Sequence, residues 1–164
     1  MKDTLSIFRA YMQLERRRAE GLSPEELERW VELGQRLDGA FGGRRAQDGS
    51  QRRATPRVPT LLNVCFEDYQ DIGSVLMTNI SRGGIFVPTD RPIPIGTEVK
   101  LRIRIEEPAT EIVLLGEISS HNVGPKLDAA RRGMGIRFKN LSEREQKLVD
   151  DLYEREVSKH LARS

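Results

Sequence analysis

Alternation of apolar and polar residues over the second half of the chain constrains the fold most strongly. Between residues 99 and 105 the sequence reads Val-Lys-Leu-Arg-Ile-Arg-Ile, so every second side chain is apolar. A period of two places the apolar side chains on one face of a strand, because successive residues point to opposite sides. The same pattern recurs over residues 62–66, 75–77 and 134–138, and residues 112–118 form a more continuous apolar run.

Prolines and glycines separate these segments and indicate turns. Pro92, Pro94 and Gly96 mark one connection, and Gly124 and Pro125 mark another. About six short strands joined by such turns predict a small antiparallel barrel over residues 58–140, because closure leaves no exposed strand edge. The predicted fold class is therefore mainly β.

Residues 1–41 show helical spacing instead. Apolar residues recur along one helical face at Leu5, Phe8 and Met12. Farther on, Ser23 is a typical N-cap, Pro24 suits the first helical position, and Glu26 completes a capping box. We therefore predict an N-terminal helical hairpin over residues 1–41. We expect Trp30 and Phe41 to be exposed on it, because two short helices bury little surface.

A second capping box, formed by Ser142 and Glu145, predicts the start of a C-terminal helix. The helix has an apolar stripe that comprises Leu148, Val149, Leu152, Tyr153 and Val157. Barrel and helix together are predicted to form a domain over residues 58–164. Residues 42–57, which are rich in Gly and Arg, are predicted to be the linker between the hairpin and this domain.

The linker carries the clearest local excess of charge. It contains five arginines and one acidic residue, Asp48, whereas the whole chain has 27 basic and 25 acidic residues and a net charge of +2. The overall balance therefore says little about partners, but the linker is a candidate anion-binding segment.

The residues needed for catalysis are scarce. The chain has two histidines, of which His121 is expected in a turn and His160 at a solvated helix end, and one cysteine, Cys65, which is expected to pack as a small buried hydrophobe. No Cys/His/Asp spacing suits zinc, and no nucleophile has an evident base. We therefore expect neither enzymatic activity nor a metal or cofactor. Without an apolar run of about 20 residues or a signal-peptide core, we also expect no membrane insertion and a cytoplasmic location.

Two arginines immediately before the first strand have the chemistry of a phosphate or guanine site. Arg53 and Arg57 are four residues apart, and a guanidinium group can form paired hydrogen bonds with phosphate oxygens or with the acceptor edge of guanine. Pro56 between them stiffens the segment and reduces the entropy lost when it becomes ordered. Taken alone, the pair is also typical of a solvated basic linker.

The segment Asn79-Ile80-Ser81-Arg82-Gly83-Gly84 is the second candidate. Asn79 and Ser81 offer short polar side chains at a strand end. Gly83 and Gly84 allow positive φ angles and a close approach of a ligand to backbone amides. A plain hairpin turn is the alternative interpretation of this segment.

Together, the two segments resemble the signature of the PilZ domain family, which is Arg-x-x-x-Arg before the first strand and Asp/Asn-x-Ser-x-x-Gly after it. Arg53 and Arg57 match the first motif, and Asn79, Ser81 and Gly84 match the second. The resemblance covers about residues 50–155 and includes Gly-Met-Gly-Ile-Arg-Phe at residues 133–138. The family more often has Asp where this chain has Asn79.

The resemblance implies a six-stranded barrel followed by a helix, and cyclic di-GMP as the ligand. It implies that Arg53 and Arg57 hold guanine and phosphate groups and fold the linker against the barrel, while Asn79, Ser81 and the two glycines of the turn contact the guanine edge. Arg52 precedes the first motif, a position at which an arginine is associated in the family with a stacked pair of ligand molecules. The resemblance therefore predicts an intercalated ligand dimer bound by Arg52, Arg53, Arg57, Asn79, Ser81, Gly83 and Gly84.

Two other functions fit the same residues. The arginine-rich linker is also typical of nucleic-acid binding, although no aromatic residue lies between Phe41 and Phe66 to stack on bases. A PilZ-like domain that has kept its fold and acts only as an interaction module is a further alternative. The N-terminal hairpin either packs against the barrel or offers a surface for self-association or for a protein partner, and the C-terminal helix either covers the mouth of the barrel or pairs with another subunit.

Overall fold

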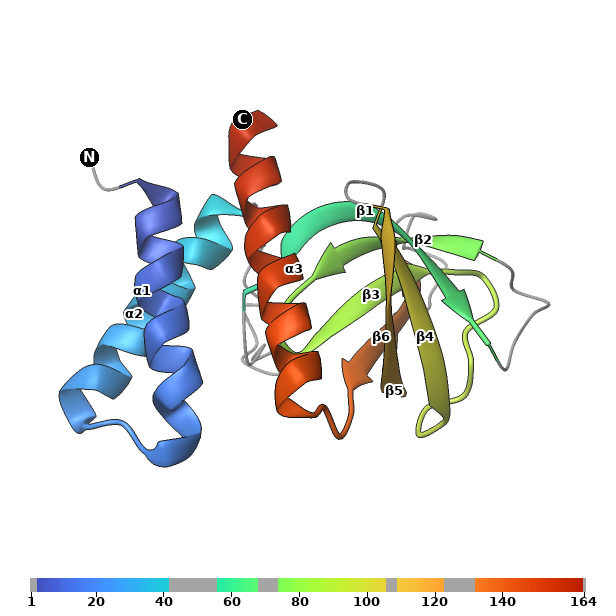
Figure 1. Cartoon of the computed structure of the whole chain (residues 1–164), viewed down its shortest axis with the longest axis horizontal. Helices are drawn as coiled ribbons and strands as arrows, with labels where there is room; N and C mark the ends of the chain where they lie inside the picture. The colour runs from blue at the N-terminus through green and yellow to red at the C-terminus, as the bar shows by residue number, and fades with distance from the viewer. Residues whose placement is uncertain (1–2, 42–55, 68–73, 106–108, 123–131, 164) are drawn as a thin grey trace. The chain divides into compact units, whose positions relative to one another are not determined.

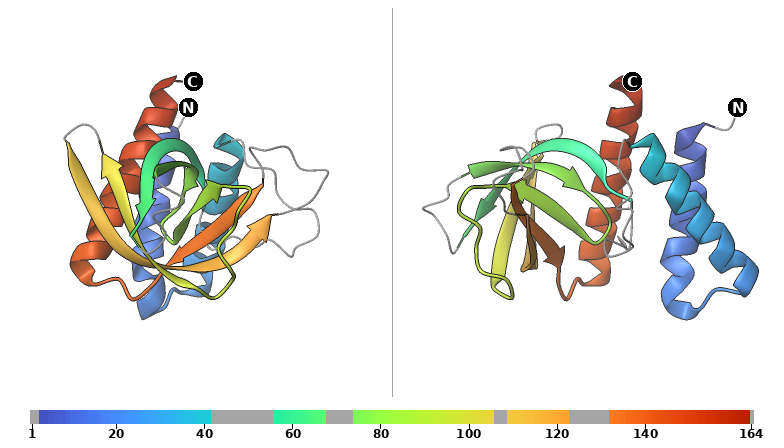
Figure 2. Two further views of the ribbon diagram at one scale, coloured as in Figure 1. Left: turned by 90° about the vertical axis from the view of Figure 1, so that its right-hand side faces the viewer. Right: turned by 180° about the vertical axis from the view of Figure 1, so that it is seen from behind.

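The computed structural model describes residues 3–41, 56–67, 74–105, 109–122 and 132–163. Six antiparallel strands close into a barrel in the order β1-β2-β3-β6-β5-β4 (Figure 1). They are β1 (Val58–Phe66), β2 (Ser74–Ile80), β3 (Gly84–Pro88), β4 (Glu98–Ile105), β5 (Thr110–Asn122) and β6 (Gly133–Phe138). Figure 2 shows from two further sides how these strands curve around a common interior. The predicted fold class is confirmed.

The alternating pattern of the sequence becomes the inside and outside of this barrel. On β4, Val99, Leu101 and Ile103 are fully buried, while Lys100 is exposed and pairs in register with Leu115 of β5. β3 differs, because Gly84, Ile85, Phe86 and Val87 are all buried. Burial on both faces removes the alternation, so this strand carries a weaker periodic signal in the sequence.

The N-terminal hairpin consists of α1 (Thr4–Arg17), a short 3-10 turn η1 (Arg18–Glu20) and α2 (Pro24–Ala40). The predicted capping box is present, because Glu26 N donates to Ser23 Oγ and Ser23 N donates to Glu26 Oε1. Tyr11 of α1 and Trp30 of α2 stack with ring centroids 6.0 Å apart, and Trp30 Nε1 donates to the buried Glu15. Trp30 is therefore half-buried rather than exposed.

The expected exposure of Phe41 was wrong. Phe41 is 3% exposed, and its ring meets the ring of His160 edge to face with centroids 6.0 Å apart. His160 is accordingly half-buried and not a fully solvated helix-end residue. Both residues belong to one compact unit, which the described residues of Met1–Val58 and Arg155–Ser164 form. The hairpin buries more than it could alone, because the last turns of the C-terminal helix contribute to the same unit.

The C-terminal helix α3 spans Glu143–Arg163 and begins at the predicted capping box. Ser142 N donates to Glu145 Oε1, and Glu145 N donates to Ser142 Oγ. Val149, Tyr153 and Val157 of the predicted stripe are fully buried, whereas Leu148 is 40% exposed. α3 contributes residues to both compact units, since Pro59–Glu154 form the second one. One boundary between the units thus falls within α3, whereas the boundaries predicted from the sequence follow residues 41 and 57.

Two further expectations were wrong. β5 continues to Asn122, beyond the apolar run that ends at Ile118. His121 lies within β5 and not in a turn, and its Nε2 is 2.6 Å from the carbonyl oxygen of Ile93. Cys65 is half-exposed, because it lies between the buried Val64 and Phe66 of β1 and so faces the outside of the barrel.

Candidate ligand-binding turn

The predicted arginine motif falls largely outside the described residues. Arg52 and Arg53 lie there, as does most of the predicted linker. Arg57 is described and is half-buried, between the buried Pro56 and the start of β1 at Val58. The structure therefore places one of the three predicted arginines, next to the barrel's first strand in the chain.

The second predicted motif forms the tight connection between β2 and β3. Ser81 is 5% exposed and organises the connection through three hydrogen bonds. Its amide donates to the carbonyl oxygen of Gly84 at 2.9 Å, its hydroxyl lies 3.4 Å from the same oxygen, and its Oγ accepts from the amide of Gly83 at 3.2 Å. Ser81 therefore holds the backbone of the turn, because it satisfies both the amide of Gly83 and the carbonyl oxygen of Gly84.

The structure distinguishes the two glycines of the turn, to which the sequence gave the same role. Neither Gly83 nor Gly84 adopts a positive φ. A Cβ at Gly84 would lie 2.2 Å from the carbonyl oxygen of Ile136, so the close approach of β6 requires glycine at this position. Gly83 has open space around its Cα and is exposed, and its carbonyl oxygen accepts from the amide of Phe138 at 2.9 Å. A ligand can therefore approach the backbone at Gly83, whereas the space at Gly84 is taken by the neighbouring strand.

Asn79 lies one residue before the end of β2 and pairs in register with Phe86 of β3. It is half-buried and has an interaction partner in the fold. Its side chain points to the opposite face of the strand from the fully buried Ile80, and its register partner Phe86 is itself buried. The structure thus brings Asn79, Ser81, Gly83 and Gly84 together at one end of a two-strand connection.

An ion pair that the sequence gave no means to predict joins this turn to α3. Arg82 Nε donates to Asp150 Oδ1 at 2.9 Å, across 68 residues of sequence. Gln146 Nε2 donates to the same oxygen at 2.9 Å. No local signal could have shown this contact, because both residues are ordinary helix-face or turn residues when they are read separately.

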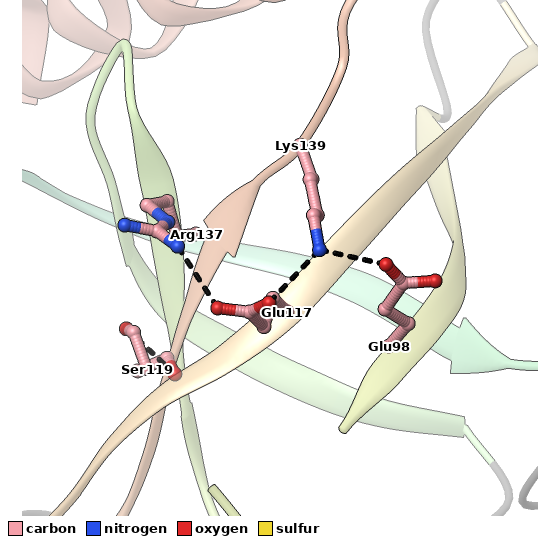
Figure 3. A network of polar contacts seen from close by, with 6 residues as sticks. Glu98, Glu117, Ser119, Arg137 and Lys139 are labelled. Atoms are coloured by element: carbon pink, nitrogen blue, oxygen red, sulfur yellow. Dashed lines mark hydrogen bonds and ion pairs between the residues drawn. The ribbon is translucent and has the colours of Figure 1, made fainter. Parts of the chain in front are cut away.

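A second set of charges lies on the outer surface of β4, β5 and β6 (Figure 3). Lys139 Nζ donates to Glu98 at 2.7 Å and to Glu117 at 3.0 Å, and Arg137 donates to Glu117 at 2.9 Å. The hydrogen bond from Lys139 holds the pKa of Glu117 below its usual range, and the bond to Glu98 raises the pKa of Lys139. Arg137 pairs in register with Gly84, so a positively charged, 62% exposed side chain lies beside the turn.

Neither a metal-binding cluster nor a membrane-spanning helix is found in the described part of the chain. Within it, no group of three or more His, Cys, Asp or Glu side chains is placed to hold a metal ion. None of its helices is both long and apolar enough to cross a membrane. The arrangement around the turn instead combines backbone amides, small polar side chains and guanidinium groups, which can bind a polar anionic ligand.

Comparisons with known proteins agree with this geometry. The family model of the PilZ domain matches residues 51–155, well over half of the 164 residues. A comparison with curated proteins finds no match.

Among solved structures, the inhibitor of motility MotI (DgrA) from Bacillus subtilis is 26% identical to the chain, with a TM-score of 0.51. The alignment covers 66% of this chain and 53% of MotI, so the chain spans about half of MotI. The PilZ domain of YcgR from Escherichia coli, solved with c-di-GMP, is 15% identical with a TM-score of 0.51, over 70% of this chain and all of that domain. At 15% identity the YcgR domain shows a common fold.

Proposed function

The chain belongs to the PilZ domain family, and from this membership we propose that it is a non-catalytic receptor for cyclic di-GMP. The observation that carries the proposal is the intact turn from Asn79 to Gly84, in which Ser81 holds the backbone and the surface of Gly83 is open. A YcgR structure with the same fold was solved with c-di-GMP. Cyclic di-GMP carries two guanines and two phosphates, which suit this combination of amides, small polar side chains and arginines.

In this proposal the turn is the fixed wall of the site. Asn79, Ser81 and the open backbone at Gly83 contact the edge of a guanine, while Gly84 keeps the turn against β6. Arg53 and Arg57 bind guanine and phosphate groups from the other side, through the paired hydrogen bonds that a guanidinium group forms. Arg52 binds a second, stacked ligand molecule. Ligand binding then orders the segment that carries these arginines and changes the protein contacts made by the helices, which is how the signal is passed on.

Calorimetric titration with cyclic di-GMP tests the proposal. We expect the wild-type protein to bind with a Kd in the micromolar range or below, with about two ligand molecules per chain if the stacked pair forms. Arg53→Ala should abolish or strongly weaken binding, because a charge-assisted paired contact is lost. Arg52→Ala should reduce the stoichiometry to one. Arg91→Ala, at an exposed arginine of the β3–β4 connection, is the matched control and should bind like the wild type.

The absence of binding by the wild-type protein would contradict the proposal.

Nucleic-acid binding through the arginine-rich segment is the second candidate, favoured by the five arginines within residues 42–57. Gel-shift measurements with duplex DNA at increasing salt distinguish the two. DNA binding through phosphates weakens steeply with salt, because bound counterions are released. A chain that binds neither ligand is best described as an interaction module, the third alternative.

A further inference from the structure

Arg82 lies in the middle of the candidate turn, which comprises residues 79–84. Its side chain forms an ion pair with a residue of α3. Its Nε lies 2.9 Å from Asp150 Oδ1, and the two side chains are 20% and 7% exposed. Ion pairs covered to this extent are screened much less by salt than exposed pairs are. The ion pair between Arg82 and Asp150 is therefore a specific link between the turn and α3, and we call it the tie. The Lys147–Asp151 pair, one residue farther along α3, is exposed to solvent instead.

The carboxylate of Asp150 is held from two sides. Gln146, one helical turn earlier, donates to the same oxygen that Arg82 binds. The neighbouring Val149 and Tyr153 are fully buried, so this part of α3 has little freedom to move sideways. Asp150 thus presents a preorganised acceptor to the turn.

Backbone hydrogen bonds within the barrel also hold the turn. Ser81 N donates to Gly84 O, and Phe138 N donates to Gly83 O. These bonds fix the two ends of the turn. Arg82 lies between them, and its side chain forms the ion pair to Asp150. The conformation of the residues that face the ligand therefore depends on α3 as well as on the barrel.

We propose that Asp150 is a positioning residue for the ligand-binding turn and acts through Arg82. This inference rests on the proposed binding of cyclic di-GMP at the turn. We assign Arg82 to Asp150 and not to a ligand phosphate, because a move toward the ligand would break an ion pair whose acidic residue is 5% exposed. Because coupling is reciprocal, bound ligand also stabilises the docked position of the first part of α3.

A double-mutant cycle on ligand affinity tests the positioning role. Arg82→Ala, Asp150→Ala and the double variant are titrated with cyclic di-GMP, beside Asp151→Ala as the control at an exposed acid of the same helix. We expect each single variant to bind roughly tenfold more weakly and the double variant to be no weaker than either, because both changes remove one tie. The control should bind like the wild type. Wild-type affinity in Asp150→Ala, together with weak binding in Arg82→Ala, would make Arg82 a direct contact and overturn the inference.

Hydrogen exchange supplies a readout that is specific to the tie. Saturating cyclic di-GMP should slow exchange of the amides of Val149–Tyr153 in the wild type and in Asp151→Ala, but not in Asp150→Ala. Equal slowing in all three proteins would contradict the inference. If Asp150→Ala does not fold, Asp150→Asn replaces it, since its amide oxygen still accepts from Arg82 but without charge. Weaker ligand binding than in Asp151→Asn then supports the tie, and equal binding overturns it.

The two proposals fail in different ways. A wild-type protein that does not bind cyclic di-GMP contradicts the proposed function, and exchange in the ligand-free protein then decides the tie. Faster exchange of the Gly83 amide in Asp150→Ala than in Asp151→Ala supports it, and equal rates overturn it. If the wild type binds and Asp150→Ala binds equally well, the receptor function stands and the positioning role falls.

Discussion

Gly83 and Gly84 are adjacent and have the same backbone freedom in the unfolded chain. In the folded protein, however, only Gly83 has room for a larger side chain. Gly84 is enclosed by the backbone of β6, because a Cβ there would lie 2.2 Å from the carbonyl oxygen of Ile136 and 3.3 Å from the Cα of Arg137. Gly83 has nothing within 4 Å of the same added atom. The reason for glycine at position 84 is thus packing of neighbouring strands and not an unusual backbone conformation, since neither glycine has a positive φ.

Alanine substitution at each glycine separates these roles. Gly84→Ala should destabilise the fold by about 3 kcal/mol or more, because the clash is with backbone that cannot rotate away. Gly83→Ala should change stability by less than about 1 kcal/mol. Urea unfolding followed by circular dichroism measures both. A stability loss of similar size in the two variants would contradict the assignment of Gly84 to strand packing.

At the level of elements, the outer face of β4, β5 and β6 is joined by a network of charges. Glu117 of β5 lies between Lys139 and Arg137, and Lys139 reaches Glu98 of β4 (Figure 3). All four side chains keep contact with solvent, so the network adds little to stability at neutral pH compared with the buried barrel core. Its effect is instead seen in how stability depends on pH.

The pKa of Glu117 is depressed in the folded protein, first by the hydrogen bond from Lys139. A carboxyl group of this kind contributes stability above its unfolded pKa of about 4.5, and the contribution is lost as the pH falls through the lower, folded pKa. We therefore expect the stability of Glu117→Gln to fall less between pH 6 and pH 3 (roughly, the range in which carboxyl groups titrate) than that of the wild type. Denaturant unfolding at stepped pH measures the difference.

The matched control for this experiment is Glu143→Gln, an acid in the first turn of α3. Its pH dependence should follow that of the wild type more closely. Identical pH dependence of Glu117→Gln and the wild type would show that the ion pairs of Glu117 make no net contribution to folding.

Across the whole molecule, the described residues divide into two compact units, and α3 supplies residues to both. The unit that contains the hairpin owes part of its core to the end of the chain, since Phe41 meets the ring of His160. The other unit contains the barrel, the candidate turn and the first part of α3. A helix that belongs to two cores cannot be removed without loss to each of them.

Phe41→Ala tests whether the hairpin and the end of α3 share a core. Phe41 is 3% exposed, and loss of a buried phenylalanine ring costs about 3–5 kcal/mol. We expect thermal unfolding of this unit at a clearly lower temperature. Leu27→Ala, at a 47% exposed position on α2, should shift the transition much less. A wild-type melting temperature in Phe41→Ala would contradict the shared core.

Much of the architecture could be predicted from the sequence, because the responsible interactions are local. Alternation over residues 99–105 depends only on the two-residue period of a strand, and it gave β4 correctly. The capping boxes at Ser23 and Ser142 depend on residues three positions apart, and both are present. The arginine motif and the Asn79–Gly84 motif are also short and local, and their resemblance to the PilZ signature led to the correct family. The ligand-binding roles of all the predicted arginines and turn residues remain predictions, as do the ligand dimer and a cytoplasmic location.

What the sequence left open depends on how distant segments meet. Position 84 requires glycine because barrel closure puts β6 against β3, and Phe41 is buried because the end of α3 joins the hairpin. The Arg82–Asp150 ion pair joins residues 68 positions apart, and the sequence around neither residue indicates this contact. Periodicity and caps are properties of a few consecutive residues, so the chain shows them before it folds. Contacts between remote residues arise only from the register and closure of the whole barrel, and these decide which side chains support the candidate turn.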